Sequence, residues 1–211
     1  MKGYSAQQVR DAEAPLRARG IPLMQMAATA LAGELRRPGI QRVLLLVGTG
    51  DNGGDALYAG AQLAESGLDV SIIASGETMH HDALGAALEM GAVVEPASRA
   101  AELVDASDVV VDGLVGIGAS GPLRGGALDL VIAAAGTLTP VVAVDIPSGI
   151  DPDSGALPGP VLPARLTVTF GAYKAGLLLE PARRVAGKVK LVDLGLDFTG
   201  VTPLVELPDP V

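Results

Sequence analysis

The sequence predicts an α/β fold with a mostly parallel sheet that is covered by helices on both faces. Three observations support this prediction. From residue 40 onward, short apolar segments alternate with segments of helical periodicity. The apolar segments are continuous runs rich in Val, Leu and Ile, which is typical of strands buried on both faces. Three of these runs end in loops rich in Gly, Asp and Ser, and ligands bind at such loops on the carboxyl edge of parallel sheets.

The composition indicates a globular protein. The chain has 211 residues, of which 49% are hydrophobic and 18% charged, and this length can bury a substantial core. A net charge of −9, with two Phe, three Tyr and no Trp, disfavours nucleic acid and anionic membranes as partners. The absence of Cys excludes disulfides and thiolate chemistry. Because the polar amino terminus lacks the apolar core of a signal peptide, we expect a cytoplasmic protein.

The leading residues predict two helices. Ser5 and Gln8 have the spacing of a capping box, which indicates a helix to about Ala18. A second, amphipathic helix is expected after Pro22. Its apolar stripe consists of Leu23, Met24, Met26, Ala27, Ala30, Leu31 and Leu35. Such a stripe has to cover either a face of the sheet or another subunit.

One domain is expected, and it divides into a helical lead-in (1–39), an αβα core (40–195) and a tail (196–211). Within the core, hydrophobic periodicity predicts strands at 43–47, 70–74, 92–94, 108–112, 141–145, 166–170 and 188–193. Helices are predicted at 56–66, 82–90, 99–104 and 128–135. Gly and Pro interrupt residues 172–186 too often for an assignment, and residues 203–211 are expected to form a loose tail.

The first loop of functional composition, VGTGDNGGD, follows the strand at 43–47. Gly48, Gly50 and Gly53 satisfy the spacing of a dinucleotide-binding fingerprint. However, Asp51 and Asp55 flank the glycines, and their charges would repel a pyrophosphate. The pattern therefore favours hydroxyl groups or a cation as ligands, with dinucleotide binding and a purely structural turn as the alternatives.

The second loop, GLVGIGASGPLRGG, occupies residues 113–126 and has almost no acidic residue. Backbone N–H groups that glycine leaves free can form a nest for an anion. Arg124 and the start of the following helix would strengthen such a nest. We interpret this loop as a phosphate cradle, and the alternative is a flexible surface loop.

Polar residues at the strand ends predict a cation site and an acid–base pair. Asp112 and Asp145 each end an apolar strand, and their carboxylates, with Asn52 and Ser148 nearby, suit a hard monovalent or divalent cation. Lys174 stands in an apolar stretch where lysine is uncommon. It could share acid and base duties with Asp145, or it could be a surface lysine with a buried stem.

Four segments in order, GTGDNGGDAL, VDGLVGIGASGPLRG, VAVDIPSGIDPDSG and LTVTFGAYKAG, resemble the NAD(P)HX epimerase family, also called the YjeF amino-terminal domain family. The resemblance runs from the leading helices to about Asp193. It implies a Rossmann-like three-layer αβα sandwich with a mostly parallel sheet, commonly a homodimer. It also implies interconversion of the R and S epimers of hydrated NADH and NADPH (NADHX and NADPHX), which a separate or fused dehydratase then repairs.

The resemblance also assigns roles to residues. It implies Asp145 and Lys174 as catalytic residues, and Asn52, Asp112 and Ser148 as ligands of a potassium ion. The substrate-binding residues that it implies are Asp51, Asn52, Gly53, Gly54, Asp55, Gly116, Ile117, Gly118, Ala119, Ser120, Gly121, Pro122 and Asp145. Asp51 departs from the family pattern, because many members carry Asn there. No dehydratase domain follows, so we expect no dehydration by this chain alone.

A chemical hypothesis follows for the implied reaction. An acid protonates the C6 hydroxyl of the reduced ring, water leaves with help from the ring nitrogen, and water re-adds to the other face. Asp145 would act as base or cation stabiliser and Lys174 as acid, or the reverse. The competing functions are a nucleotide-binding module without turnover and a nicotinamide-dependent oxidoreductase.

Overall fold

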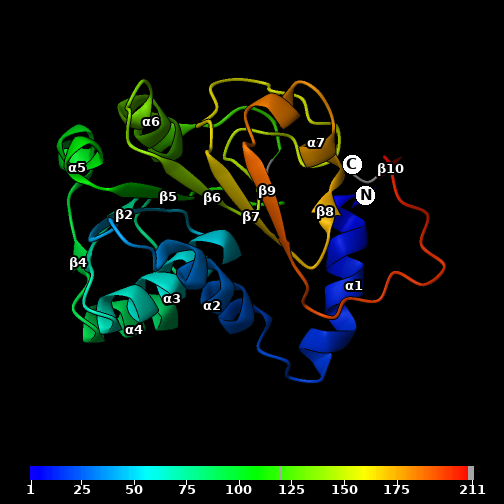
Figure 1. Ribbon diagram of the computed structural model, residues 1–211, viewed down its shortest axis with the longest axis horizontal. Helices are drawn as coiled ribbons and strands as arrows, with labels where there is room; N and C mark the ends of the chain where they lie inside the picture. The colour runs from blue at the N-terminus through cyan, green and yellow to red at the C-terminus, as the bar shows by residue number, and fades with distance from the viewer. Residues whose placement is uncertain (119, 209–211) are drawn as a thin grey trace.

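The chain forms one large parallel sheet between two layers of helices (Figure 1). The computed structural model describes residues 1–118 and 120–208, so Ala119 of the predicted substrate loop lies outside the described residues. The seven strands, all parallel, follow the order β4-β3-β2-β5-β6-β7-β9. Their bounds are β2 Arg42–Val47, β3 Asp69–Ala74, β4 Val93–Val94, β5 Val109–Gly113, β6 Val141–Val144, β7 Leu166–Phe170 and β9 Lys188–Val192.

The central strand β2 shows why the sheet is buried on both faces. Alternate side chains point to opposite sides of a strand. Val43, Leu45 and Val47 pack with α2, α3 and α4, while Leu44 and Leu46 pack with α5 and α6. These helices are α2 Leu23–Leu35, α3 Asp51–Glu65, α4 His81–Glu89, α5 Ala100–Ala106 and α6 Gly125–Ala134. The α/β architecture with helices on both faces is therefore confirmed.

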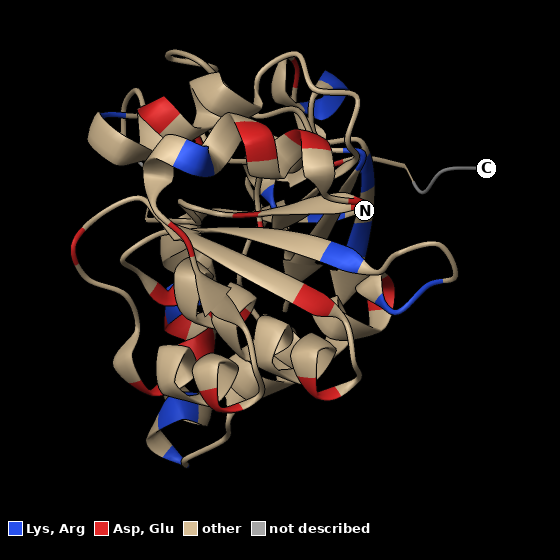
Figure 2. Cartoon of the chain, turned by 90° about the vertical axis from the view of Figure 1, so that its left-hand side faces the viewer, with Lys and Arg blue, Asp and Glu red and all other residues tan. Residues whose placement is uncertain are grey.

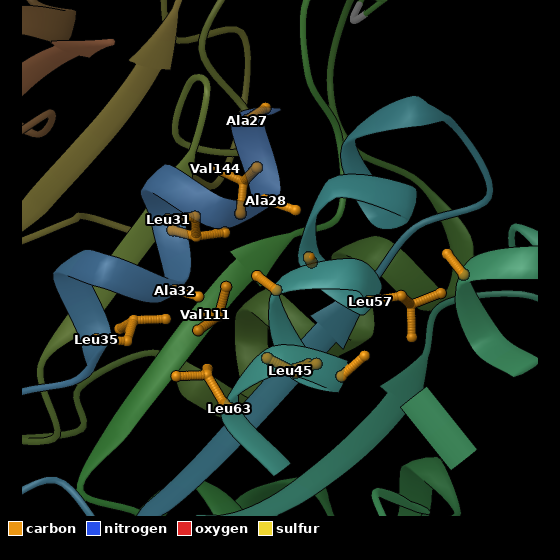
Figure 3. Close-up of a cluster of buried hydrophobic side chains, with 14 of the residues drawn as sticks. Ala27, Ala28, Leu31, Ala32, Leu35, Leu45, Leu57, Leu63, Val111 and Val144 are labelled. Atoms are coloured by element: carbon orange, nitrogen blue, oxygen red, sulfur yellow. The ribbon is translucent and has the colours of Figure 1, made fainter. Parts of the chain in front are cut away.

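The apolar stripe of α2 covers the sheet, which resolves the two expectations for it. Leu31 and Leu35 belong to a buried hydrophobic cluster (Figure 3). The same cluster contains Leu45 and Val111 of the sheet and Leu57 of α3. Burying each such leucine stabilises the fold by about 1.5 to 3 kcal/mol. Met26 of the same helix remains 39% exposed.

A small second sheet at the side of the molecule differs from the sequence prediction. Its order is β10-β1-β8, with β1 Lys2–Tyr4, β8 Tyr173–Lys174 and β10 Val205–Glu206. The expectation of a loose tail is therefore wrong at residues 205–206, which pair with β1. Strands of two or three residues are too short to produce an alternating pattern that could predict them.

The amino-terminal helix α1, Ala6–Ala18, begins with the capping box that the sequence predicts at Ser5 and Gln8. Asp153 adds a second cap, because the Ala6 N–H donates to its Oδ1 at 2.7 Å. This bond ties α1 to the long loop after β6. In Figure 1, α1 stands beside β8, outside the two layers that cover the large sheet.

Three helices begin elsewhere than predicted. α3 begins at Asp51, so that Gly53 and Gly54 are helical and not part of a loop. α6 begins at Gly125. Ser98 lies in a 3₁₀ turn, Ala97–Arg99, and does not cap α5. The unassigned segment contains β8, the short helix α7 Ala175–Leu178 and a 3₁₀ turn at Ala182–Arg184.

Charged residues are dispersed over both helical layers and the strand ends (Figure 2). The sequence has 24 acidic and 15 basic residues, and the basic positions are interspersed with the acidic ones in this view. Among the described residues, no helix has the length and apolar character that crossing a membrane requires.

The strand order places a crevice between β2 and β5. From β2 the chain continues outward to β3 and β4 on one side, and from β5 to β6, β7 and β9 on the other. Loops that leave two adjacent strands in opposite directions separate from each other, and ligands bind in the crevice between them. The two glycine-rich loops that the sequence singles out follow these two strands.

Candidate active site

A cavity of about 540 Å³ opens at this crevice. Its lining comes from the loops after β2 and β5, the ends of β6 and β7, strand β8, and helices α1, α2 and α3. Among the predicted site residues, those that line it are Asp51, Asn52, Asp55, Gly116, Ile117, Gly118, Asp145 and Lys174. The convergence of three strand-end loops on one cavity, which the sequence predicts, is therefore present.

The other described residues that the sequence predicts to bind substrate do not line the cavity. Gly53 and Gly54 are buried within α3, where a Cβ on Gly53 would lie 2.2 Å from the Gly48 carbonyl oxygen. Ser120, Gly121 and Pro122 belong to the exposed part of the second loop. The structure thus brings the first half of the predicted phosphate loop to the cavity.

Lys174 and Asp145 form a buried ion pair in the cavity wall. Lys174 is 1% exposed, and its ammonium group donates to Asp145 Oδ1, to Thr169 Oγ1 at 3.2 Å and to the Phe170 carbonyl oxygen at 2.8 Å. A lysine has three N–H donors, so these acceptors use all of them. The alternative of a surface lysine is wrong, and Lys174 is placed to fix the Asp145 carboxylate.

The Asp145 carboxylate is held by one oxygen. Oδ1 accepts from Lys174, from Thr169 Oγ1 at 3.1 Å and from the Phe170 N–H at 3.1 Å. Within residues 1–118 and 120–208, no hydrogen bond is made to Oδ2. Oδ2 is therefore available to a ligand in the cavity.

The backbone of Asp145 is strained. Its φ of 64° lies in the left-handed region, and it is the single non-glycine residue with positive φ in the described chain. The Asp145 N–H still donates to the Val168 carbonyl oxygen at 2.7 Å. Strain of this kind is concentrated at functional sites, and here it turns the side chain from the end of β6 toward Lys174.

Asp112 and Ser148 form a second buried polar pair beneath the cavity. Both are 0% exposed, and Ser148 donates to Asp112 through its Oγ at 2.6 Å and its N–H at 2.8 Å. Burial raises the pKa of Asp112, and the bonds from Ser148 and Leu114 oppose that rise. Val115 joins the pair, because its N–H donates to Ser148 Oγ at 3.0 Å.

Asn52 approaches the same loop from α3. Its side chain packs against Gly116, where an added Cβ would lie 3.0 Å from Asn52 Oδ1. The buried Nδ2 of Asn52 has no hydrogen-bond partner among the described atoms. Rotating the amide exchanges oxygen and nitrogen, which would turn an unpaired donor into an unpaired oxygen ligand. Asn52, Asp112 and Ser148 would then offer a hard cation one amide oxygen, one carboxylate and one hydroxyl oxygen.

Helix α1 contributes residues that the sequence analysis did not assign to the site. Arg10 donates to the Ile117 carbonyl oxygen at 2.9 Å, and Arg17 pairs with Asp51 at 3.3 Å and with Glu13 at 3.0 Å. Arg17 therefore offsets the charge that Asp51 adds. The sequence shows charges along one side of α1, but no pattern indicates that this side faces the cavity.

The doubly wound parallel sheet, with its cavity at the switch point, defines a Rossmann-like α/β protein with a ligand site. The fold is shared with the crystal structure of yeast YNL200c, at a TM-score of 0.77 and 19% identity, over 90% of this chain and 88% of that one.

Sequence comparison then gives the family. The family model described as "YjeF-related protein N-terminus" matches residues 20–176. An NAD(P)H-hydrate epimerase of Clavibacter michiganensis subsp. michiganensis is 46% identical, over 96% of this chain and 94% of its own length. A bifunctional NAD(P)H-hydrate repair enzyme Nnr of Mycobacterium tuberculosis is 44% identical over 92% of this chain, which spans 42% of that enzyme. The chain belongs to the YjeF-related amino-terminal family.

Proposed function

We infer that the protein is an NAD(P)H-hydrate epimerase, an isomerase that interconverts the R and S epimers of hydrated NADH and NADPH. The observation that carries this inference is the 46% identity to an epimerase along almost the full length of both chains. The cavity supports it, because an ion-paired carboxylate there suits a reaction that passes through a cation.

The site accounts for the chemistry of epimerisation. Protonation of the C6 hydroxyl lets water leave while the ring nitrogen lone pair forms a C=N bond, and the resulting cation accepts water on its other face. Asp145 Oδ2 is free to stabilise the cation or to take a proton from the incoming water. Lys174 has no N–H left for the substrate, so we assign it the role of positioning Asp145.

One experiment tests this function against the two alternatives. The protein is incubated with a single purified epimer of NADHX, and the other epimer is followed by chromatography. We expect interconversion faster than in buffer. Binding without interconversion would favour a nucleotide-binding module, and a spectral change of intact NAD with a reducible substrate would favour an oxidoreductase.

We also propose that a potassium ion binds at Asn52, Asp112 and Ser148. The support is the unpaired amide of Asn52 and the single carboxylate in the donor set. The bound ion would supply a positive charge that orders the oxygen atoms of the second glycine-rich loop. We expect thermal stability to be higher in potassium chloride than in lithium chloride at equal ionic strength. In Ser148→Ala this difference should disappear, and an equal difference in that variant would contradict the site.

Arg17 and Asp51 provide a test of the charge at the cavity mouth. Arg17→Gln should weaken binding of NADHX a few-fold, because it leaves Asp51 unbalanced near an anionic ligand. The variant loses the ion pairs of Arg17 with Asp51 and with Glu13, and each surface pair of this kind contributes about 1 kcal/mol or less to the free energy of unfolding. Adding Asp51→Asn should restore binding. A double variant as weak as Arg17→Gln, measured by calorimetric titration, would show that the pair does not act in this way.

Assembly and partners are further proposals. On the family resemblance we propose a homodimer, which light scattering of the purified protein would test, and a cytoplasmic location, which cell fractionation would test. The M. tuberculosis relative is bifunctional, so we propose a dehydratase as the functional partner here. Adding a purified NAD(P)HX dehydratase should allow complete repair of a mixture of both epimers, and the dehydratase alone should leave one epimer unrepaired.

A further inference from the structure

Asp55 is a carboxyl group in the cavity with which no described residue pairs. It lies in the second turn of α3 and lines the same cavity as Asp145 and Lys174. Across the described chain, no hydrogen bond or ion pair is made to its side chain. Asp55 is partly exposed, and a carboxyl group that is partly removed from water with no cation beside it is more stable in its neutral form.

The surroundings of Asp55 favour the neutral form. Burial is the largest effect that raises the pKa of Asp55 well above its usual range, and the nearby carboxylates of Asp145, Asp51 and Glu13 raise it further. Lys174 acts in the opposite direction, but its ammonium group contacts Asp145. The other cations that line the cavity are also engaged: Arg17 pairs with Asp51 and Glu13, and Arg10 donates to the Ile117 carbonyl oxygen. Asp55 therefore keeps its proton at pH values where an ordinary aspartate has lost it.

Asp55 and Asp145, two of the four acidic residues that line the cavity, are thus unlike each other. Asp145 is paired with a lysine through Oδ1, whereas Asp55 has no cationic partner within residues 1–118 and 120–208. Carboxyl groups whose surroundings separate their protonation states take opposite roles as acid and base. Lys174 cannot supply the acid, because its three donors are already engaged.

We propose that Asp55 is the general acid of the epimerisation, a role that rests on the function proposed above. Asp55 donates its proton to the C6 hydroxyl as the C6–O bond breaks, and it is left as a carboxylate while the ring nitrogen lone pair forms the C=N bond. Water then bonds to C6, the C=N bond returns to a single bond, and Asp145 Oδ2 takes the proton from this water. Exchange with solvent returns a proton to Asp55 and removes one from Asp145.

The kinetic test compares Asp55→Asn with Glu65→Gln, an exposed position at the far end of the same helix. Asp55→Asn should lower kcat by about 10² to 10⁴-fold, the usual contribution of a positioned acid, with much less change in the Kd for NADHX. The wild-type rate should fall as pH rises through the pKa of Asp55, and Asp55→Asn should lack this fall. A kcat equal to that of Glu65→Gln would overturn the proposal.

A stability measurement tests the protonation state without turnover. In the unfolded chain Asp55 ionises near its ordinary pKa of about 3.9, whereas in the folded chain it stays neutral to a higher pH. Between these two values the unfolded state gains stability, so the folded wild type loses stability as pH rises. The Tm of Asp55→Asn should therefore rise relative to wild type as pH increases above 4, and that of Glu65→Gln should not.

These measurements separate the two inferences. The wild type could fail to interconvert NADHX epimers while the Tm difference between Asp55→Asn and wild type still grows with pH. The proposed function would then fail, and the inference that Asp55 is protonated would stand. If the wild type interconverts them and Asp55→Asn does so equally fast, the acid role of Asp55 fails alone. A Tm difference that is constant with pH would overturn the protonated Asp55 directly, even if the variant were inactive for another reason.

Discussion

Asp145→Asn should lower kcat for epimerisation by about 10² to 10⁴-fold, as expected when a proton-transferring group is removed. The amide cannot take a proton from the incoming water, and it removes the negative charge that faces the cationic intermediate. Its oxygen can still accept from the Phe170 N–H, as Asp145 Oδ1 does at 3.1 Å. Asn also tolerates positive φ better than most residues, so the backbone at 64° should be retained.

The measurement is the initial rate of NADHX epimer interconversion, with circular dichroism to verify folding. Asp69→Asn is the matched control, because this aspartate is exposed at the start of β3, away from the cavity. The control should keep the wild-type rate. An Asp145→Asn variant with wild-type kcat would mean that the carboxylate does not act in the slow step.

The large sheet could be predicted because each of its main strands is a continuous apolar run. Buried parallel strands leave this pattern in the sequence itself, and β2, β5 and β6 were identified with boundaries within one residue. The start of α3 could not be predicted in the same way. Gly53 and Gly54 have low helix propensity, and their close packing against Gly48 and Met24, which explains why glycine stands there, is a tertiary contact that the sequence does not show.

The same distinction applies to the site. Asp112, Asp145 and Ser148 follow strands whose carboxyl ends share one edge, so topology alone predicts that they come together. The pairs Asp112–Ser148 and Asp145–Lys174 confirm this proximity. Arg10 and Arg17 could not be found by this argument, because α1 follows a strand of the small sheet and its orientation depends on tertiary contacts.

The sequence also could not show that all three N–H donors of Lys174 are engaged. A lysine near an aspartate can be an acid, a base or a fixed counter-ion, and residue types do not distinguish these roles. Only the three acceptors around its ammonium group do so. The acid that the reaction requires must then come from another group, and this is the reason for considering Asp55.

Gly48→Ala should destabilise the fold by more than about 3 kcal/mol, above the range of most single substitutions. A Cβ at this position would lie 1.8 Å from the Leu114 carbonyl oxygen, and the atoms it meets are backbone atoms, which cannot turn aside as the end of a flexible side chain can. Gly50→Ala is the matched control, since nothing lies within 4 Å of its Cβ. At this helix N-cap, with φ of −99°, alanine should cost less than about 1 kcal/mol.

Urea unfolding of both variants measures these differences, and equal losses of unfolding free energy would contradict the explanation by close packing at Gly48.

The comparison also tests why the loop matches the glycine pattern of a dinucleotide fingerprint. In a dinucleotide fingerprint the middle glycine lets a pyrophosphate approach the backbone, and Gly50 does face the open cavity. Gly48 and Gly53, however, are required by the contact of the first loop with Leu114 and with its own helix. Two of the three glycines therefore serve packing, which explains how a loop flanked by aspartates can match a phosphate-binding pattern.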